Sequence, residues 1–156
     1  MNSYFNKRTI FIVIVVAMVL IFFNFSNLTS LNKKEEVKKT SERERYMYVV
    51  INGKSYYATL DNSKTVDEFL ELLPQKYTME ELNGNEKYVY IKEKLTSKSV
   101  LLDEIRRGDI MLYQDNCIVL FYDTFSPNYS YTKIGHINDL PPLGEGSIEI
   151  EFKKGE

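Results

Sequence analysis

Side chains that could bind or position a ligand gather in one short stretch, residues 82–88, whose sequence is LNGNEKY. Asn83, Asn85 and Glu86 carry amide and carboxylate groups that can form hydrogen bonds, and Tyr88 follows Glu86 by two residues. An Asn-Gly pair also favours a tight turn, so a purely structural turn is the alternative interpretation. We expect these four residues to form one side of a binding site at the end of a strand.

Tyrosine is the most abundant aromatic residue, with 12 tyrosines and no tryptophan in the chain. Tyr113, Tyr122, Tyr129 and Tyr131 could line an aromatic groove that binds a peptide or a flat ring. They could equally be strand residues with buried rings and hydroxyls at the surface. We expect Tyr113 or Tyr131 to face the 82–88 stretch. The candidate ligand-binding residues are therefore Asn83, Asn85, Glu86, Tyr88, Tyr113 and Tyr131.

No set of residues in the sequence indicates a catalytic site, and the catalytic residues stay unassigned. The chain has one histidine, His136, and one cysteine, Cys117, which excludes an intrachain disulfide and a cysteine-based zinc cluster. His136 could act as a general base beside Glu86 or Asp139, but a histidine in the loop predicted there is typically solvated. Cys117 opens an apolar run and is expected to be a small buried hydrophobe. There is no calcium-loop or glycine-rich nucleotide motif, so we expect no metal and no cofactor.

Length and charge restrict the class of protein further. The chain has 156 residues, which allows one domain, and it is 44% hydrophobic, which is typical of a folded protein. Lysine and arginine number 20 against 22 aspartates and glutamates, and the excess of acids is concentrated after residue 45. A nucleic-acid partner is therefore not expected.

The N-terminal region carries an apolar run, Ile10–Phe23, directly behind Lys7 and Arg8. The run fits the apolar core of a signal peptide, about 7–15 residues. The longer stretch 9–25 reaches the lower limit of a membrane-spanning helix, about 17–25 residues. No small-residue cleavage pattern follows the run, which favours an uncleaved signal anchor.

Four segments follow from this interpretation. Residues 1–8 form a cytoplasmic basic head, 9–25 a transmembrane signal anchor or a signal peptide, 26–45 a polar charged tether, and 46–156 a folded domain. Lysines in the tether count against this orientation under the positive-inside rule. A short basic head before an apolar run is nevertheless the usual arrangement for export. We expect a single-pass protein of the cell membrane with its domain outside the cytoplasm.

Strand patterns dominate the folded domain. An Asn-Gly pair at 52–53 between two β-rich runs predicts a hairpin. Thr65 and Glu68 match a capping box, which predicts a helix that ends before Pro74. Residues 100–107 are ambiguous and could form a short helical turn. The expected strands are 46–51, 55–60, 76–82, 86–91, 110–113, 117–122, 129–134 and 147–152.

The order of these motifs resembles that of small bacterial cyclophilin-like proteins, a domain family without a settled function. The most specific blocks are LNGNEKY at 82–88 and GDIMLY at 108–113, and the resemblance extends from about Tyr46 to Phe152. It implies a closed eight-stranded barrel with a short capping helix. The expected fold class is therefore mainly β: a closed eight-stranded cyclophilin-like β-barrel with one short helix, preceded by an N-terminal transmembrane helix.

The leading functional hypothesis is a non-catalytic module that binds a peptide or a small planar ligand at the mouth of the barrel. The alternative is an extracytoplasmic peptidyl-prolyl isomerase, because such an enzyme aims an arginine at the prolyl nitrogen and Arg106 or Arg107 could serve. The aromatic signature expected of a true cyclophilin is missing, which weighs against this alternative. A third hypothesis, a partner of a redox flavoprotein, is compatible only with the tyrosines.

Overall fold

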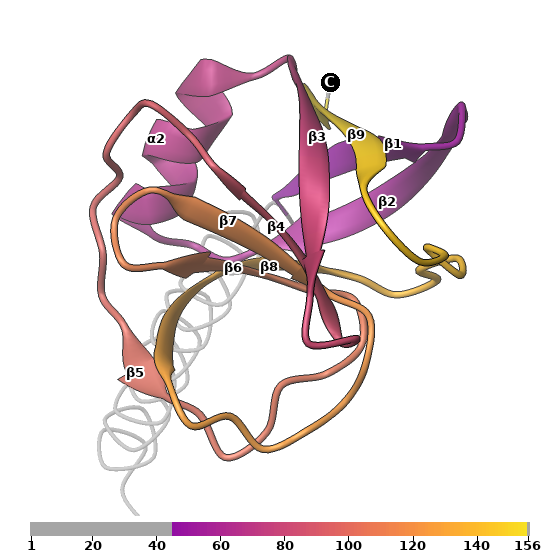
Figure 1. Ribbon diagram of the computed structural model, residues 1–156. Helices are drawn as coiled ribbons and strands as arrows, with labels where there is room; N and C mark the ends of the chain where they lie inside the picture. The colour runs from indigo at the N-terminus through magenta and orange to yellow at the C-terminus, as the bar shows by residue number, and fades with distance from the viewer. Residues whose placement is uncertain (1–44, 156) are drawn as a thin grey trace, which may run out of the picture. The chain divides into compact units, whose positions relative to one another are not determined.

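The structure, a computed structural model, describes residues 45–155 (Figure 1). The predicted head, membrane anchor and nearly all of the tether lie outside these described residues. Within residues 45–155, no helix is both long enough and apolar enough to cross a membrane.

The described part of the chain forms nine strands and one helix. In chain order they are β1 (Tyr46–Ile51), β2 (Lys54–Leu60), α2 (Lys64–Leu72), β3 (Gln75–Leu82), β4 (Glu86–Tyr90), β5 (Val100–Leu101), β6 (Asp109–Tyr113), β7 (Cys117–Phe121), β8 (Ser130–Ile137) and β9 (Ile148–Lys154).

Eight of the described strands close into an antiparallel barrel, in the order β2, β1, β9, β3, β4, β7, β6 and β8. The barrel closes where β8 pairs with β2, with Ile137 opposite Ala58. The two-residue strand β5 pairs with β8 and lies outside the ring (Figure 1). The predicted mainly β fold, a closed eight-stranded barrel with one helix, is therefore confirmed for residues 45–155.

Two local predictions need correction. The segment 100–107, for which a helical turn was considered, contains strand β5 and an irregular stretch. Strand β8 continues past residue 134 to Ile137, so His136 lies on a strand and not in a loop.

The hairpin prediction is confirmed, because Asn52 and Gly53 both have positive φ angles, 51° and 76°, between β1 and β2.

The helix begins with a different cap from the one predicted. Ser63 is the N-cap, and its hydroxyl accepts a hydrogen bond from the Val66 backbone N–H at 3.3 Å. Thr65 instead donates to the carbonyl oxygen of Thr96 at 2.5 Å, and Glu68 accepts from the Thr96 backbone N–H. The predicted capping box of Thr65 and Glu68 is therefore wrong, because both side chains form hydrogen bonds with the connection between β4 and β5.

Two apolar clusters lie on opposite faces of strand β7. Ile118 and Leu120 belong to the cluster inside the barrel, whereas Cys117, Val119 and Phe121 belong to a second cluster outside it. Successive side chains of a strand point to opposite faces, so this alternation separates an inner from an outer wall. All five residues of β7 are buried, as predicted for this run.

The outer cluster is covered by two connections, one leading from β5 to β6 and the other from β7 to β8. They lie together at the bottom of the view in Figure 1. Ile105 and Phe125 join them by two backbone hydrogen bonds, at 2.9 and 3.0 Å, and both side chains pack on the outer cluster. The barrel thus has a covered outer wall, and this wall positions the site described below.

Candidate functional site

A cavity of about 530 Å³ lies between the outer wall of the barrel and the β7–β8 connection. Strands β4, β6, β7 and β8 supply one side, residues 125–129 supply the other, and the β3–β4 turn closes one end. Every ligand-binding residue predicted from the sequence lines this one cavity: Asn83, Asn85, Glu86, Tyr88, Tyr113 and Tyr131. Residues from three separate parts of the sequence therefore come together as expected.

The cavity is not at the mouth of the barrel, where we expected it. Glu86, Tyr88 and Tyr90 alternate along β4 and line the cavity on the outer wall. Lys87 and Val89 lie between them and face the other way, with Val89 packed on the cluster inside the barrel. The ligand-facing residues are thus on the side of β4 opposite the barrel interior.

A buried lysine occupies the inner side of β4, next to the β3–β4 turn. Lys87 has no exposed side-chain surface, and its ammonium lies 2.6 Å from a carboxylate oxygen of Glu81. It also donates to the carbonyl oxygens of Gly144 and Gly146, at 2.9 and 2.5 Å. Tyr122 donates to the same glutamate at 2.8 Å, so Tyr122 belongs to this network and not to the aromatic groove.

Aromatic rings form much of the cavity surface. Among the described residues, five tyrosines line it: Tyr88, Tyr90, Tyr113, Tyr129 and Tyr131. The ring of Tyr113 lies edge-on to Tyr129, with centroids 6.0 Å apart, and tilted against Tyr131 at 5.6 Å. Three of the four tyrosines proposed for an aromatic groove therefore do lie together.

Glu86 brings a negative charge into this aromatic surrounding. It is 8% exposed, and within residues 45–155 its carboxylate takes part in no hydrogen bond or ion pair. Burial raises the pKa of Glu86 above its ordinary value. Burial raises the pKa of Cys117 to about 11 and that of Tyr131 to about 12, and nearby Glu86 is the second largest cause for both groups. Both groups are therefore neutral near pH 7, and Glu86 is the one carboxyl group among the described residues that line the cavity.

The two asparagines have different roles. Asn83, with a φ angle of 57°, forms the β3–β4 turn together with Gly84, so the turn interpretation holds for it. Asn85 holds the end of the turn through its backbone, donating to Leu82 and accepting from Tyr122. Its side-chain oxygen Oδ1 is buried and accepts no hydrogen bond from the described residues. Asn85 therefore lines the cavity with other atoms, since this oxygen has almost no accessible surface.

Sequence reasoning missed several lining residues. Tyr90 could have been found, because it follows Glu86 and Tyr88 at the strand period of two. Cys117 and Val119 carried no such signal, since β7 is apolar throughout and its outward face is not distinguishable by sequence. The contribution of residues 125–128 depends on how a long connection folds back over the barrel, which no local pattern indicates.

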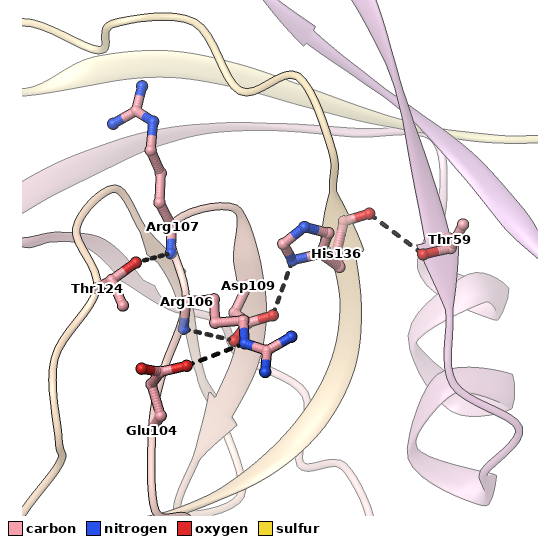
Figure 2. Close-up of polar contacts among 7 residues, drawn as sticks. All are labelled: Thr59, Glu104, Arg106, Arg107, Asp109, Thr124 and His136. Atoms are coloured by element: carbon pink, nitrogen blue, oxygen red, sulfur yellow. Dashed lines mark hydrogen bonds and ion pairs between the residues drawn. The ribbon is translucent and has the colours of Figure 1, made fainter.

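A second cavity, also about 530 Å³, surrounds the lone histidine. The Nδ1 atom of His136 lies 2.9 Å from Asp109, which in turn accepts from the Arg106 backbone N–H at 2.9 Å (Figure 2). The partner of His136 is therefore Asp109, not Glu86 or Asp139. Asp109 and His136 lie directly opposite each other on β6 and β8. They join two strands of the barrel as well as facing this cavity.

The two arginines considered for isomerase chemistry are engaged elsewhere. Arg107 donates through its guanidinium to the carbonyl oxygens of Tyr122, Leu140 and Pro141, at 2.5–3.0 Å. Arg106 is exposed and pairs with Glu104 at 3.0 Å (Figure 2). Among residues 45–155 there is also no group of three or more metal-ligating side chains.

Comparisons with known proteins agree with this architecture. A solution structure of a hypothetical protein from Archaeoglobus fulgidus is similar, with a TM-score of 0.50 and 19% sequence identity. The similarity covers 74% of this chain and 99% of that one, and it concerns the fold alone. A comparison with curated proteins gave no match. The sequence matches the cyclophilin-like family over residues 49–153, from β1 to β9, and the chain accordingly belongs to the cyclophilin-like family.

Proposed function

We propose that this cyclophilin-like domain is a non-catalytic binding module that takes a peptide or a small ligand in the tyrosine-lined cavity. The observation that carries the proposal is the convergence of six polar and aromatic residues, selected from the sequence, on one cavity. Its volume of about 530 Å³ falls in the range of small-molecule sites, roughly 300–1,000 Å³.

The chemistry of the lining favours binding over catalysis. Cys117 is the single cysteine of the chain, and its raised pKa of about 11 makes it a poor nucleophile at neutral pH. Glu86 and the tyrosines can form hydrogen bonds and stacking contacts, each worth about 0.5–1.5 kcal/mol. A ligand that makes a few such contacts would bind in the micromolar to millimolar range, unless a longer peptide extends the contact surface.

The proposal extends to location. The apolar run behind a basic head supports an anchor at residues 9–25, which would hold the domain outside the cytoplasm at the cell membrane. Protease added to intact cells should then degrade the domain. Protection of the domain would contradict this location, and a soluble chain that starts near residues 29–32 would indicate a cleaved signal peptide instead.

Binding can be tested with the full-length chain in detergent micelles, using capped tripeptides Gly-X-Gly in which X covers all side chains. At least one peptide should shift the amide NMR signals of residues 82–90 and 125–131. Tyr129→Ala should weaken that binding, because it removes an aromatic ring that lines the cavity. Tyr129 is 62% exposed, so its truncation should leave the fold intact. The matched control is Tyr48→Ala, which removes an exposed tyrosine on β1, outside the cavity lining. Shifts confined to other parts of the barrel would refute the proposed site.

The isomerase alternative is tested on the same preparation with a protease-coupled assay on a proline peptide. We expect no acceleration of prolyl isomerisation. The Arg107 guanidinium is hydrogen-bonded to three carbonyl groups, and Arg106 is paired with Glu104. A rate enhancement that disappears in Arg106→Ala or Arg107→Ala would replace the binding proposal with the enzymatic one.

A further inference from the structure

The charge balance of the tyrosine-lined cavity is one-sided. Among the described residues that line it, Glu86 is the one charged side chain, and none is a lysine, arginine or histidine. In a partly desolvated cavity, a single uncompensated charge has a stronger effect than it would have in water. Such a cavity disfavours anions such as phosphates and carboxylates.

The carboxylate of Glu86 is also without a counter-ion. The neighbouring lysine in the sequence, Lys87, points to the inner side of β4, where it is paired with Glu81. Buried carboxylates in proteins are normally paired or hydrogen-bonded, because desolvation of an isolated charge is costly. Glu86 is 8% exposed and the described residues supply no such partner, so a cationic ligand would stabilise its ionised form.

A second acceptor lies next to Glu86 in the chain. The side-chain oxygen of Asn85 is buried and unpaired among residues 45–155, and Asn85 lines the same cavity. Buried acceptors in native proteins are nearly always hydrogen-bonded. The Asn85 oxygen has almost no accessible surface, so an N–H donor on a ligand would reach the Glu86 carboxylate and not this atom.

The aromatic rings favour the same class of ligand. The faces of tyrosine rings carry partial negative charge and attract cations within about 6 Å of the ring centre. Tyr88 and Tyr90 stand on β4 on the same side as Glu86. Tyr113 and Tyr131 belong to β6 and β8 of the same wall, and Tyr129 lies in the segment that forms the opposite wall. A carboxylate surrounded by tyrosines is a suitable site for a cation attached to an apolar body.

We infer that the cavity binds an organic cation, a protonated amine or guanidinium group on an apolar body, with Glu86 as its counter-ion. This inference rests on the proposed binding function and narrows its ligand to one charge class. The cation could be a free amine or the lysine or arginine side chain of a peptide, since both present the same group.

The test uses three probes of similar size and different charge on the full-length chain in detergent micelles: phenethylamine, phenethyl alcohol and hydrocinnamate. At neutral pH the amine should bind at the cavity about tenfold more tightly than the alcohol, and the carboxylate most weakly. Glu86→Gln should bring the amine and the alcohol to similar affinity. The matched control Glu71→Gln makes the same change on the exposed side of α2 and should leave the preference intact.

The outcomes separate the inference from the function on which it rests. Equal binding of the amine and the alcohol, or tighter binding of hydrocinnamate, would refute the cation and leave the binding module intact. Absence of shifts at residues 82–90 and 125–131 with every probe would refute both. A capped Gly-Lys-Gly peptide compared with Gly-Gln-Gly distinguishes the sources, and preference for the lysine peptide over phenethylamine would identify a peptide ligand.

Discussion

Removing the charge of Glu86 should stabilise the folded domain. The carboxylate is 8% exposed, and no described residue neutralises it. Burying a polar group without a hydrogen bond costs roughly 1–3 kcal/mol in protein mutational data. Water can enter a cavity of about 530 Å³ and hydrate part of the charge, and glutamine remains polar. The expected gain for Glu86→Gln at neutral pH is therefore in the lower half of that range, about 1–2 kcal/mol.

The gain should depend on pH in a defined direction. Burial raises the pKa of Glu86 in the folded state above its value in the unfolded chain. Below the pKa of Glu86 in the unfolded chain, about 4.3, the contribution of the protonated carboxyl group to the free energy of unfolding is complete. This contribution is lost as the pH rises through the pKa of Glu86 in the folded domain. Wild type and Glu86→Gln should therefore be equally stable at acidic pH, and the variant should become the more stable one above the raised pKa.

Urea unfolding of both proteins, followed by circular dichroism at neutral and acidic pH, measures this difference. For a domain of about 100 residues, 1 kcal/mol also corresponds to a change of about 4–8 °C in Tm. The control Glu71→Gln should change stability by less than about 0.5 kcal/mol, as exposed substitutions usually do. A Glu86→Gln variant that is less stable than wild type at neutral pH would show that the carboxylate is well solvated or paired, and the reasoning would fail.

Three further predictions concern the barrel itself. Lys87→Met should lower the free energy of unfolding by about 2–4 kcal/mol, because it leaves Glu81 without its buried partner; a urea midpoint unchanged from wild type would contradict this. Hydrogen bonds from Lys87 and then from Tyr122 lower the pKa of Glu81, so wild-type stability should fall as the pH drops through that lowered value. Glu81→Gln should reduce this loss of stability at acidic pH in a pH series of thermal melts. An unchanged loss would show that other groups cause it. Gly108→Ala should destabilise by about 2–4 kcal/mol in urea titrations, because φ is 100° and the new Cβ would collide with the Ile137 carbonyl oxygen. A fully stable variant would mean that the turn can relax.

The sequence predicted several elements well where a local rule governs them, although the capping box at Thr65 and Glu68 was wrong. The Asn52-Gly53 hairpin followed from the positive φ angles that such a turn requires, and they are present. The local sequence is also consistent with the burial of these strands: the last strand alternates and is buried on one face, and the apolar runs of β6 and β7 are buried on both. The placement of Glu86 and Tyr88 on one face of β4 also follows from the sequence, because the two residues are separated by the strand period of two.

The remaining features depend on which strands become neighbours, and local patterns do not contain that information. The pairing of Asp109 with His136 depends on the register of β6 and β8, across 27 residues of sequence. No local pattern marks Lys87 as buried, although it is fully buried in a network closed by Glu81 on β3. The same limit explains why the site was expected at the barrel mouth.

The two walls of the tyrosine-lined cavity differ in what they contribute to the fold. One wall consists of hydrogen-bonded strands that close the barrel, whereas the other is a continuous segment, residues 125–129, within a single connection. Surface connections tolerate changes in length and composition far better than paired strands do. A new ligand preference could therefore evolve by exchange of this one segment, while the barrel that supports it stays the same.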